Sequence, residues 1–128
     1  GKTGDAAQIV IGAGINLAMR RIEEDIVNQG WINLQEAGIA IDRNTLAVRL
    51  IKALRVALAQ FEQEGLSPWL TRWEKLDNFI HRPVKLIIGD KEIFGISRGI
   101  GPQGALLLEQ DGEIKPWMGG EISLRSAE

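Results

Sequence analysis

The hydrophobic and polar positions change their period along the chain, and the first pattern is an almost continuous apolar run. The run Ala7–Ile15 is rich in β-branched residues, which predicts a buried strand. Between Leu17 and Trp31 the apolar residues fall at helical spacing, but Asn28-Gln29-Gly30 breaks the pattern. This second segment is compatible with a short helix or with a loop that orders only on contact, and periodicity leaves both interpretations open.

A long amphipathic helix is predicted next. An apolar stripe runs from Leu46 to Phe61, and either Asp42 or Asn44 can cap its start. Gly65 lies just past the last periodic residue, where a left-handed residue commonly ends a helix.

A second helix is expected directly afterwards, with Ser67 as N-cap and Pro68 at the first helical position. Four apolar residues are expected to face one side of it: Trp69, Trp73, Leu76 and Ile80. Because the link between the two helices is short, we expect them to pack as an antiparallel or angled hairpin.

After His81-Arg82-Pro83 the period changes to that of strands. Five short strands are predicted, at residues 84–88, 93–100, 105–109, 114–117 and 121–125. Gly95 suggests a bend or bulge, and Asp111-Gly112 is a tight-hairpin signal. So many strands in so short a segment predict a small SH3-like barrel. The chain is therefore expected to divide into residues 1–81 and residues 82–128.

Composition excludes several classes of protein. The net charge is −2 with both signs mixed, so there is no electrostatic footprint for nucleic acid. The sequence contains no cysteine, which fits a cytoplasmic protein, and no apolar run approaches the ~20 residues that cross a membrane. With His81 as the single histidine, neither a catalytic triad nor a metal site is expected.

Gly12-Ala13-Gly14 at the end of the first predicted strand is the most informative short motif. A dinucleotide-binding fingerprint requires a third glycine at position 17, which is Leu17, so that interpretation is disfavoured. Two glycines also permit close approach of another backbone or of a flat ligand, and packing against a neighbouring element is the simpler alternative. Asn16 can donate and accept at the strand end, where binding residues often lie.

Two further groups of residues allow both a structural and a functional interpretation. The apolar residues between positions 17 and 31 are either core or a lid that closes around an aromatic ring: Met19, Ile22, Ile26, Val27 and Trp31. In the last strand, Ile122 and Leu124 should face the core, with Glu121 and Arg125 on the opposite face. These two charges lie ~13 Å apart along an extended strand. They are therefore either ordinary surface charges or part of a domain interface.

The segment Gln8–Asn16 resembles the Gly-x-Gly-x-Asn strand of biotin protein ligases. Residues 82–100 and 104–126, including Lys115–Glu121, resemble the C-terminal barrel of the bacterial bifunctional biotin ligase and biotin-operon repressor. The resemblance covers the full length of the chain. It implies an α/β fold, namely the C-terminal part of a class II synthetase-like catalytic domain followed by a small SH3-like β-barrel.

The resemblance also implies an activity. Members of this family join biotin and ATP, with Mg²⁺, into biotinyl-5′-adenylate and then pass biotin to a lysine of the biotin carboxyl carrier protein. The full-length bifunctional proteins also repress transcription as homodimers, and they bind operator DNA through an N-terminal domain that this sequence does not contain.

Residue roles follow from the same resemblance. The adenylate would lie against Gly12, Ala13, Gly14, Ile15 and Asn16, with Met19, Ile22, Val27 and Trp31 gathered around the adenine. Glu121 and Arg125 would couple the barrel to the catalytic domain and to ligation. Lys2, Thr3, Gly4 and Asp5 would lie in a surface loop used for homodimerisation and for docking the carrier protein.

Two motifs of the family are missing from the sequence. These are the biotin-and-phosphate loop and the Lys-Trp-Pro-Asn-Asp motif with its following active-site lysine. No catalytic residue is therefore expected in this chain, and it should be inactive alone. Because the sequence begins at Gly1 without an initiator Met, an excised fragment is expected. A binding module without enzymatic activity, based on the SH3-like barrel, is the alternative.

Overall fold

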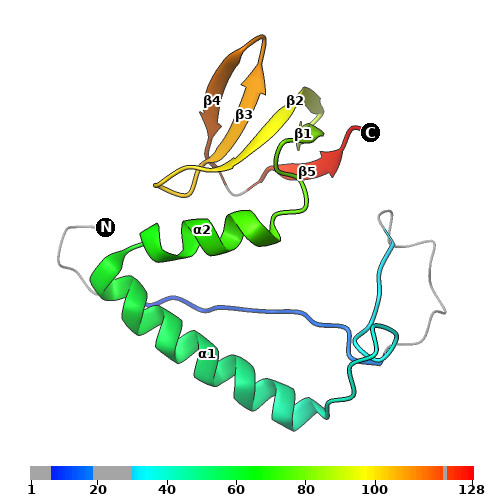
Figure 1. Cartoon of the computed structure of the whole chain (residues 1–128), viewed down its shortest axis with the longest axis vertical. Helices are drawn as coiled ribbons and strands as arrows, with labels where there is room; N and C mark the ends of the chain where they lie inside the picture. The colour runs from blue at the N-terminus through cyan, green and yellow to red at the C-terminus, as the bar shows by residue number, and fades with distance from the viewer. Residues whose placement is uncertain (1–6, 19–29, 120) are drawn as a thin grey trace. The chain divides into compact units, whose positions relative to one another are not determined.

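The computed structural model describes residues 7–18, 30–119 and 121–128 of the chain (Figure 1). Seven elements follow one another along the sequence: α1 (Arg43–Glu64), α2 (Ser67–Leu76), β1 (Pro83–Ile88), β2 (Lys91–Ile100), β3 (Leu106–Gln110), β4 (Glu113–Trp117) and β5 (Ser123–Ser126). The chain forms two compact units, Gly1–Leu54 and Arg55–Glu128. The predicted division at residue 82 falls at the turn before β1, and it stays a prediction.

Residues 7–16 form an extended segment that is not part of any sheet, drawn in blue in Figure 1. The prediction of a buried strand at residues 7–15 is wrong for the structure: Val10 is 98% exposed and Ile9 is 75% exposed. A buried strand needs neighbours that pair with its backbone and cover its side chains. The described part of the first unit contains no strand that could supply them.

Helix α1 begins and ends where the sequence predicted. Asp42 caps it, because the Thr45 amide donates to Asp42 Oδ2 at 3.2 Å and the Thr45 hydroxyl donates to Oδ1. These hydrogen bonds from Thr45 hold the pKa of the Asp42 carboxyl below its ordinary value. At the other end, Gly65 has a φ of 68° and its amide donates to Phe61 O at 2.8 Å.

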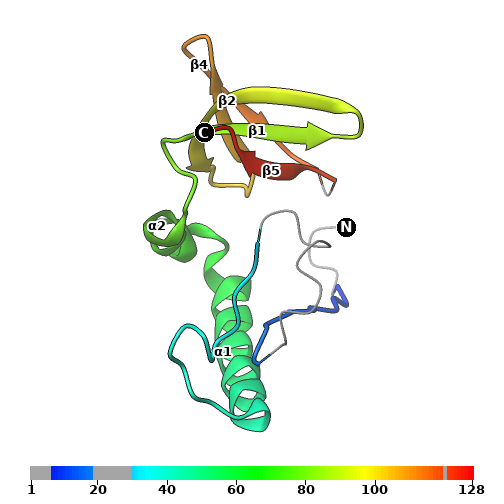
Figure 2. The same cartoon turned by 90° about the vertical axis from the view of Figure 1, so that its right-hand side faces the viewer.

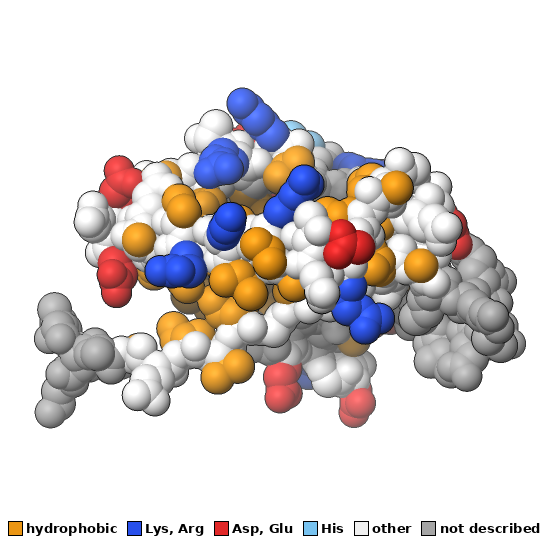
Figure 3. All heavy atoms as spheres, turned by 90° about the horizontal axis from the view of Figure 1, so that it is seen from below, with side chains coloured by type: hydrophobic (Ala, Val, Ile, Leu, Met, Phe, Trp, Pro, Cys, Tyr) orange, Lys and Arg blue, Asp and Glu red, His pale blue; other side chains and the backbone are white. Residues whose placement is uncertain are grey.

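No residue of α1 is buried in the structure. Its apolar stripe is open, with Ile51 and Phe61 at least half exposed. Figure 3 shows the molecule from below, and on this face hydrophobic side chains (orange) lie between Lys and Arg side chains (blue). An apolar stripe of this kind ordinarily packs against another element, and the described residues do not cover it.

Helix α2 starts one residue earlier than a Ser67 N-cap would require. Leu66 occupies the N-cap position without a side-chain hydrogen bond, and Ser67 and Pro68 are the first helical residues. The prediction of a shared apolar face is partly wrong, because Leu76 is 81% exposed and Ile80 lies beyond the helix end. Where the two helices meet, the Phe61 and Trp69 rings lie 6.3 Å apart, a distance at which aromatic rings attract.

The second unit contains a five-stranded antiparallel sheet in the order β4-β3-β2-β1-β5, as expected for the small SH3-like barrel. Figure 2 shows β1 between β2 and β5. The core contains Val84, Leu86 and Leu108, all with 0% exposure. Six partly buried residues pack against it: Phe79, Ile93, Leu106, Trp117, Ile122 and Leu124.

Turn chemistry explains how the strands connect. Asp111 and Gly112 both have positive φ, 51° and 79°, which is the backbone of a two-residue hairpin and confirms that prediction. The bulge expected at Gly95 lies further along β2, since the register with β3 shifts between Ser97 and Ile100. Gly95 serves close approach instead. A Cβ there would lie 2.6 Å from the carbonyl oxygen of Glu109.

Candidate functional site

The segment that carries the Gly-x-Gly-x-Asn pattern is open to solvent in the structure. Residues 12–16 are all exposed, and a Cβ added at Gly12 or Gly14 would meet none of the described atoms within 4 Å. The simpler interpretation, packing of these glycines against a neighbouring element, is therefore not realised among the described residues. The free space beside both glycines leaves room for a flat ligand.

Asn16 marks the point where this segment becomes fixed. Its backbone carbonyl accepts from the Leu34 amide at 2.9 Å, and the carbonyl of Leu17 accepts from the Gln35 amide at 3.2 Å. The side-chain amide of Asn16 donates to the Ile32 carbonyl at 3.4 Å. Three hydrogen bonds thus join residues 16–17 to residues 32–35, although most of residues 7–16 lie free.

A tight turn supplies these donors. The Ala37 amide donates to Asn33 O at 3.1 Å and the Ile39 amide to Leu34 O at 2.9 Å, while Gly38 adopts a φ of 84°. This turn is not among the elements that the hydrophobic pattern predicts. An Asn three residues before a Glu is a helix-start signature, and it could have drawn attention to Asn33 and Glu36.

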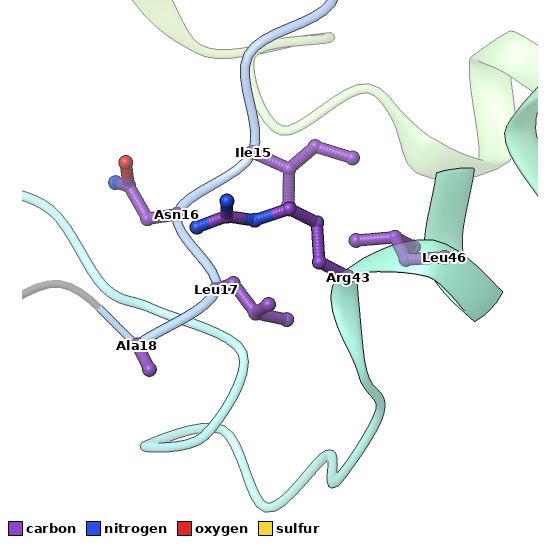
Figure 4. A pocket seen from close by; sticks show the side chains of 6 residues that line it. All are labelled: Ile15, Asn16, Leu17, Ala18, Arg43 and Leu46. Atoms are coloured by element: carbon purple, nitrogen blue, oxygen red, sulfur yellow. The ribbon is translucent and has the colours of Figure 1, made fainter.

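A cavity of about 400 Å³ adjoins Asn16 within the first unit (Figure 4). It lies between the extended segment and the start of α1, and it is lined by Ile15, Asn16, Leu17, Ala18, Arg43 and Leu46. Figure 4 shows the Arg43 side chain extending from the start of α1 toward the extended segment. The volume is within the range of small-molecule sites. Arg43 is a cation that no sequence motif marks, because it follows directly after the Asp42 cap.

Several predicted site residues lie outside the described part of the chain. These are the expected adenine contacts Met19, Ile22 and Val27, and the expected interface residues Lys2, Thr3, Gly4 and Asp5. Trp31, the last of the expected adenine contacts, is described and half-buried. The structure thus brings Ile15 and Asn16 to one cavity, and the role of all these residues remains a prediction.

The two predicted barrel residues differ in their setting. Arg125 lies in β5 opposite Lys85 of β1, and its guanidinium donates to the Leu124 carbonyl at 2.8 Å. Leu124 packs on the core, as predicted. The prediction that Glu121 belongs to the last strand is wrong, since β5 begins at Ser123 and Glu121 lies exposed in a bend.

A polar cluster occupies the junction between α2 and the sheet. Arg98 Nη1 lies 2.9 Å from His81 Nδ1, and Arg98 Nη2 lies 2.9 Å from Glu109 Oε2. Arg98 of β2 is thereby bonded both to the turn before β1 and to β3. His81 adopts a φ of 63°, which is uncommon for a residue with a Cβ. Across the described residues, no group of three His, Cys, Asp or Glu side chains could hold a metal ion, and no helix is long and apolar enough to cross a membrane.

Comparison with known proteins finds similarity to biotin protein ligases. Residues 79–125 match the family model of the biotin protein ligase C terminal domain. The bifunctional ligase/repressor BirA of Escherichia coli is 84% identical over 128 residues, and that of Salmonella typhimurium is 83% identical over the same length. Over its whole length the chain is thus similar to one part of these bifunctional biotin ligases. Each match covers 100% of this chain and 40% of the length of the ligase.

Solved structures of biotin protein ligases share the fold. The apo structure of the ligase from Aquifex aeolicus matches with a TM-score of 0.78 and 27% sequence identity, and the match covers 88% of this chain and 51% of that one. The same ligase in complex with biotin and ATP gives a TM-score of 0.78 with 27% identity, over 88% and 48% of the two chains. A fold of this ligase type, including the five-stranded C-terminal domain, is therefore established for the chain.

Proposed function

We propose that this chain forms one wall of the nucleotide site and the C-terminal domain of a bifunctional biotin ligase and repressor. The complete protein would make biotinyl-5′-adenylate from biotin and ATP and transfer the biotin to a lysine of the biotin carboxyl carrier protein. The observation that carries this proposal is the 84% identity to the Escherichia coli bifunctional ligase/repressor along the whole chain.

The described residues fit a nucleotide in three respects. Gly12 and Gly14 leave open space beside an exposed backbone, so a planar base could lie against it. Asn16 is fixed by hydrogen bonds on both its backbone and its side chain, so a polar contact to a ligand would cost little reorganisation. Arg43 adds a cation to the adjacent cavity and has no ion pair among the described residues.

The remaining roles rest on residues of the complete protein. Gly12, Ala13, Gly14, Ile15 and Asn16 would hold the adenylate, and Met19, Ile22, Val27 and Trp31 would surround its adenine. Mg²⁺ would enter with the phosphates of ATP, because this ion is usually held by substrate phosphates together with one or two carboxylates. This chain would bind and orient the nucleotide, whereas the groups that activate it lie elsewhere, and the chain alone would be inactive.

The proposed partners follow the same pattern. The carrier protein would dock at a surface that includes Lys2, Thr3, Gly4 and Asp5, which would also form the homodimer. Operator DNA would be bound by another domain of the complete protein. Glu121 and Arg125 would influence ligation from the C-terminal domain. The proposed location is the cytoplasm, where the carrier protein and the operator DNA would both be accessible.

The test compares the complete protein with this chain. Pyrophosphate release that depends on biotin, followed by biotin transfer to the carrier protein, is expected from the complete protein and not from the 128-residue chain. Substitution Asn16→Ala should weaken nucleotide binding about tenfold, which corresponds to one hydrogen bond. Asn44→Ala is the matched control, since Asn44 is exposed and does not line the cavity.

Two results would contradict the proposal. One is the absence of biotin-dependent pyrophosphate release from the complete protein. The other is strong thermal stabilisation of the isolated chain by biotinyl-5′-adenylate, because a chain that contributes one wall of the site should bind the ligand weakly.

A further inference from the structure

Asn33 is the one buried side chain among the described residues of the first unit. It is 5% exposed, whereas the buried apolar residues all belong to the second unit. A buried amide costs free energy unless its polar atoms are paired, so a small apolar residue would be the ordinary choice at such a position. The amide is therefore present for the hydrogen bonds that it makes.

Both polar atoms of the Asn33 side chain form hydrogen bonds with Glu36. Asn33 Oδ1 accepts from the Glu36 amide at 2.7 Å, and Asn33 Nδ2 donates to Glu36 Oε1 at 3.1 Å. This is a variant of the capping box, in which the two side chains hold the first turn of a helix reciprocally. Here it closes the turn 34–38, which is not followed by a helix until Arg43.

The turn 34–38 and the residue before Asn33 hold Asn16 in place. The Leu34 amide donates to the Asn16 carbonyl at 2.9 Å, and the Gln35 amide donates to the Leu17 carbonyl at 3.2 Å. The Asn16 side chain donates to the carbonyl of Ile32. No described strand or buried apolar contact fixes Asn16 in place of these bonds. The position of Asn16 thus depends on a turn whose shape depends on Asn33.

We propose that Asn33 is a positioning residue for the nucleotide site, which acts by holding Asn16 through the turn 34–38. Asn33 does not touch the ligand. This inference rests on the proposed function, because it assumes that Asn16 contacts the adenylate. Binding groups that are held to within a fraction of an ångström bind more tightly than groups that must reorganise, so loosening the turn should reduce affinity for the adenylate.

The experiment is a double-mutant cycle in the complete protein. The affinities for biotinyl-5′-adenylate and for biotin alone are measured for the wild type, Asn33→Ala, Asn16→Ala and the double variant, with the unliganded melting temperature of each. Asn44→Ala is the matched control, since it removes an exposed amide from the same unit without touching the turn or the lining of the cavity. Asn33→Ser keeps an oxygen that can accept from the Glu36 amide and should restore part of the affinity.

The proposal expects Asn33→Ala to weaken adenylate binding about tenfold, to leave biotin binding unchanged, and to have no further effect once Asn16 is alanine. If Asn16→Ala weakens binding but Asn33→Ala behaves like Asn44→Ala, the positioning role is refuted. It is also refuted if the effects of Asn16→Ala and Asn33→Ala on affinity multiply in the double variant. If Asn16→Ala itself has no effect, the proposed contact between Asn16 and the nucleotide is refuted instead. Should Asn33→Ala fail to fold, the same cycle with Asn33→Ser decides between these outcomes.

Discussion

The contact between β2 and β3 at Gly95 leaves no room for a methyl group. A Cβ at this position would lie 2.6 Å from the Glu109 carbonyl oxygen and 2.8 and 2.9 Å from two Leu108 side-chain carbons. Real Cβ atoms essentially never approach other atoms below 3.0 Å, so one strand must move. The Glu109 carbonyl belongs to the backbone of the ladder, where Glu109 is paired with Ile96, and Leu108 is a fully buried core residue.

Substitution Gly95→Ala should therefore destabilise the second unit by about 2–3 kcal/mol, at the upper part of the range for overpacked cores. For a unit of this size, that corresponds to a melting temperature lower by about 10–20 °C. The measurement is thermal and urea unfolding of the complete protein, followed by circular dichroism and tryptophan fluorescence.

Gly101→Ala is the matched control for this prediction. A Cβ at Gly101 would approach its nearest neighbour, the flexible Leu107 side chain, at 3.4 Å, which is ordinary contact. Its stability should stay within about 0.5 kcal/mol of the wild type. Equal stability of the two variants would refute the conclusion that β2 and β3 require a glycine at position 95.

Two further predictions concern charged groups. Hydrogen bonds from Thr45 lower the pKa of Asp42, so its stabilisation of α1 should be present above the unfolded pKa and be lost as the pH falls through the folded pKa. Asp42→Ala should therefore have less helix than the wild type at neutral pH, as measured by circular dichroism. If the wild type and Asp42→Ala lost the same amount of helix on acidification, this account of the cap would be contradicted. The Arg82–Glu128 pair, 2.7 Å apart, lowers the pKa of Glu128 chiefly through its hydrogen bond, yet both side chains are more than 40% exposed. Glu128→Gln should therefore lower the free energy of unfolding slightly at low salt and not at all in 1 M NaCl, where the screening length is about 3 Å. A loss of stability that persists in 1 M NaCl would count against this account.

Features set by neighbouring residues in the sequence were predictable. Asp42 and Gly65 define the ends of α1, and Asp111-Gly112 forms its hairpin, because each depends on backbone groups only a few residues away. The five strands of the C-terminal domain were located to within two residues at every end for the same reason. Local turn chemistry and strand alternation carry this information without help from distant contacts.

Features that depend on a distant partner were not predictable. The run 7–15 has the composition of a buried strand, but composition cannot supply the strand that must lie beside it, and the described structure leaves it exposed. Asn33 escaped attention because its importance comes from burial and from its link to Asn16, which is 17 positions earlier in the sequence.

The position of β5 beside β1 has a consequence for how the C-terminal domain assembles. Strands β1 to β4 follow one another as hairpins, but β1 gains its second neighbour only when β5 arrives from about 40 residues downstream. Until then, the apolar sequence Pro83–Ile88 presents an unpaired backbone edge, which is a template for aggregation. The four residues of β5 therefore act as a cover strand, and a protein truncated before Ser123 should aggregate through β1.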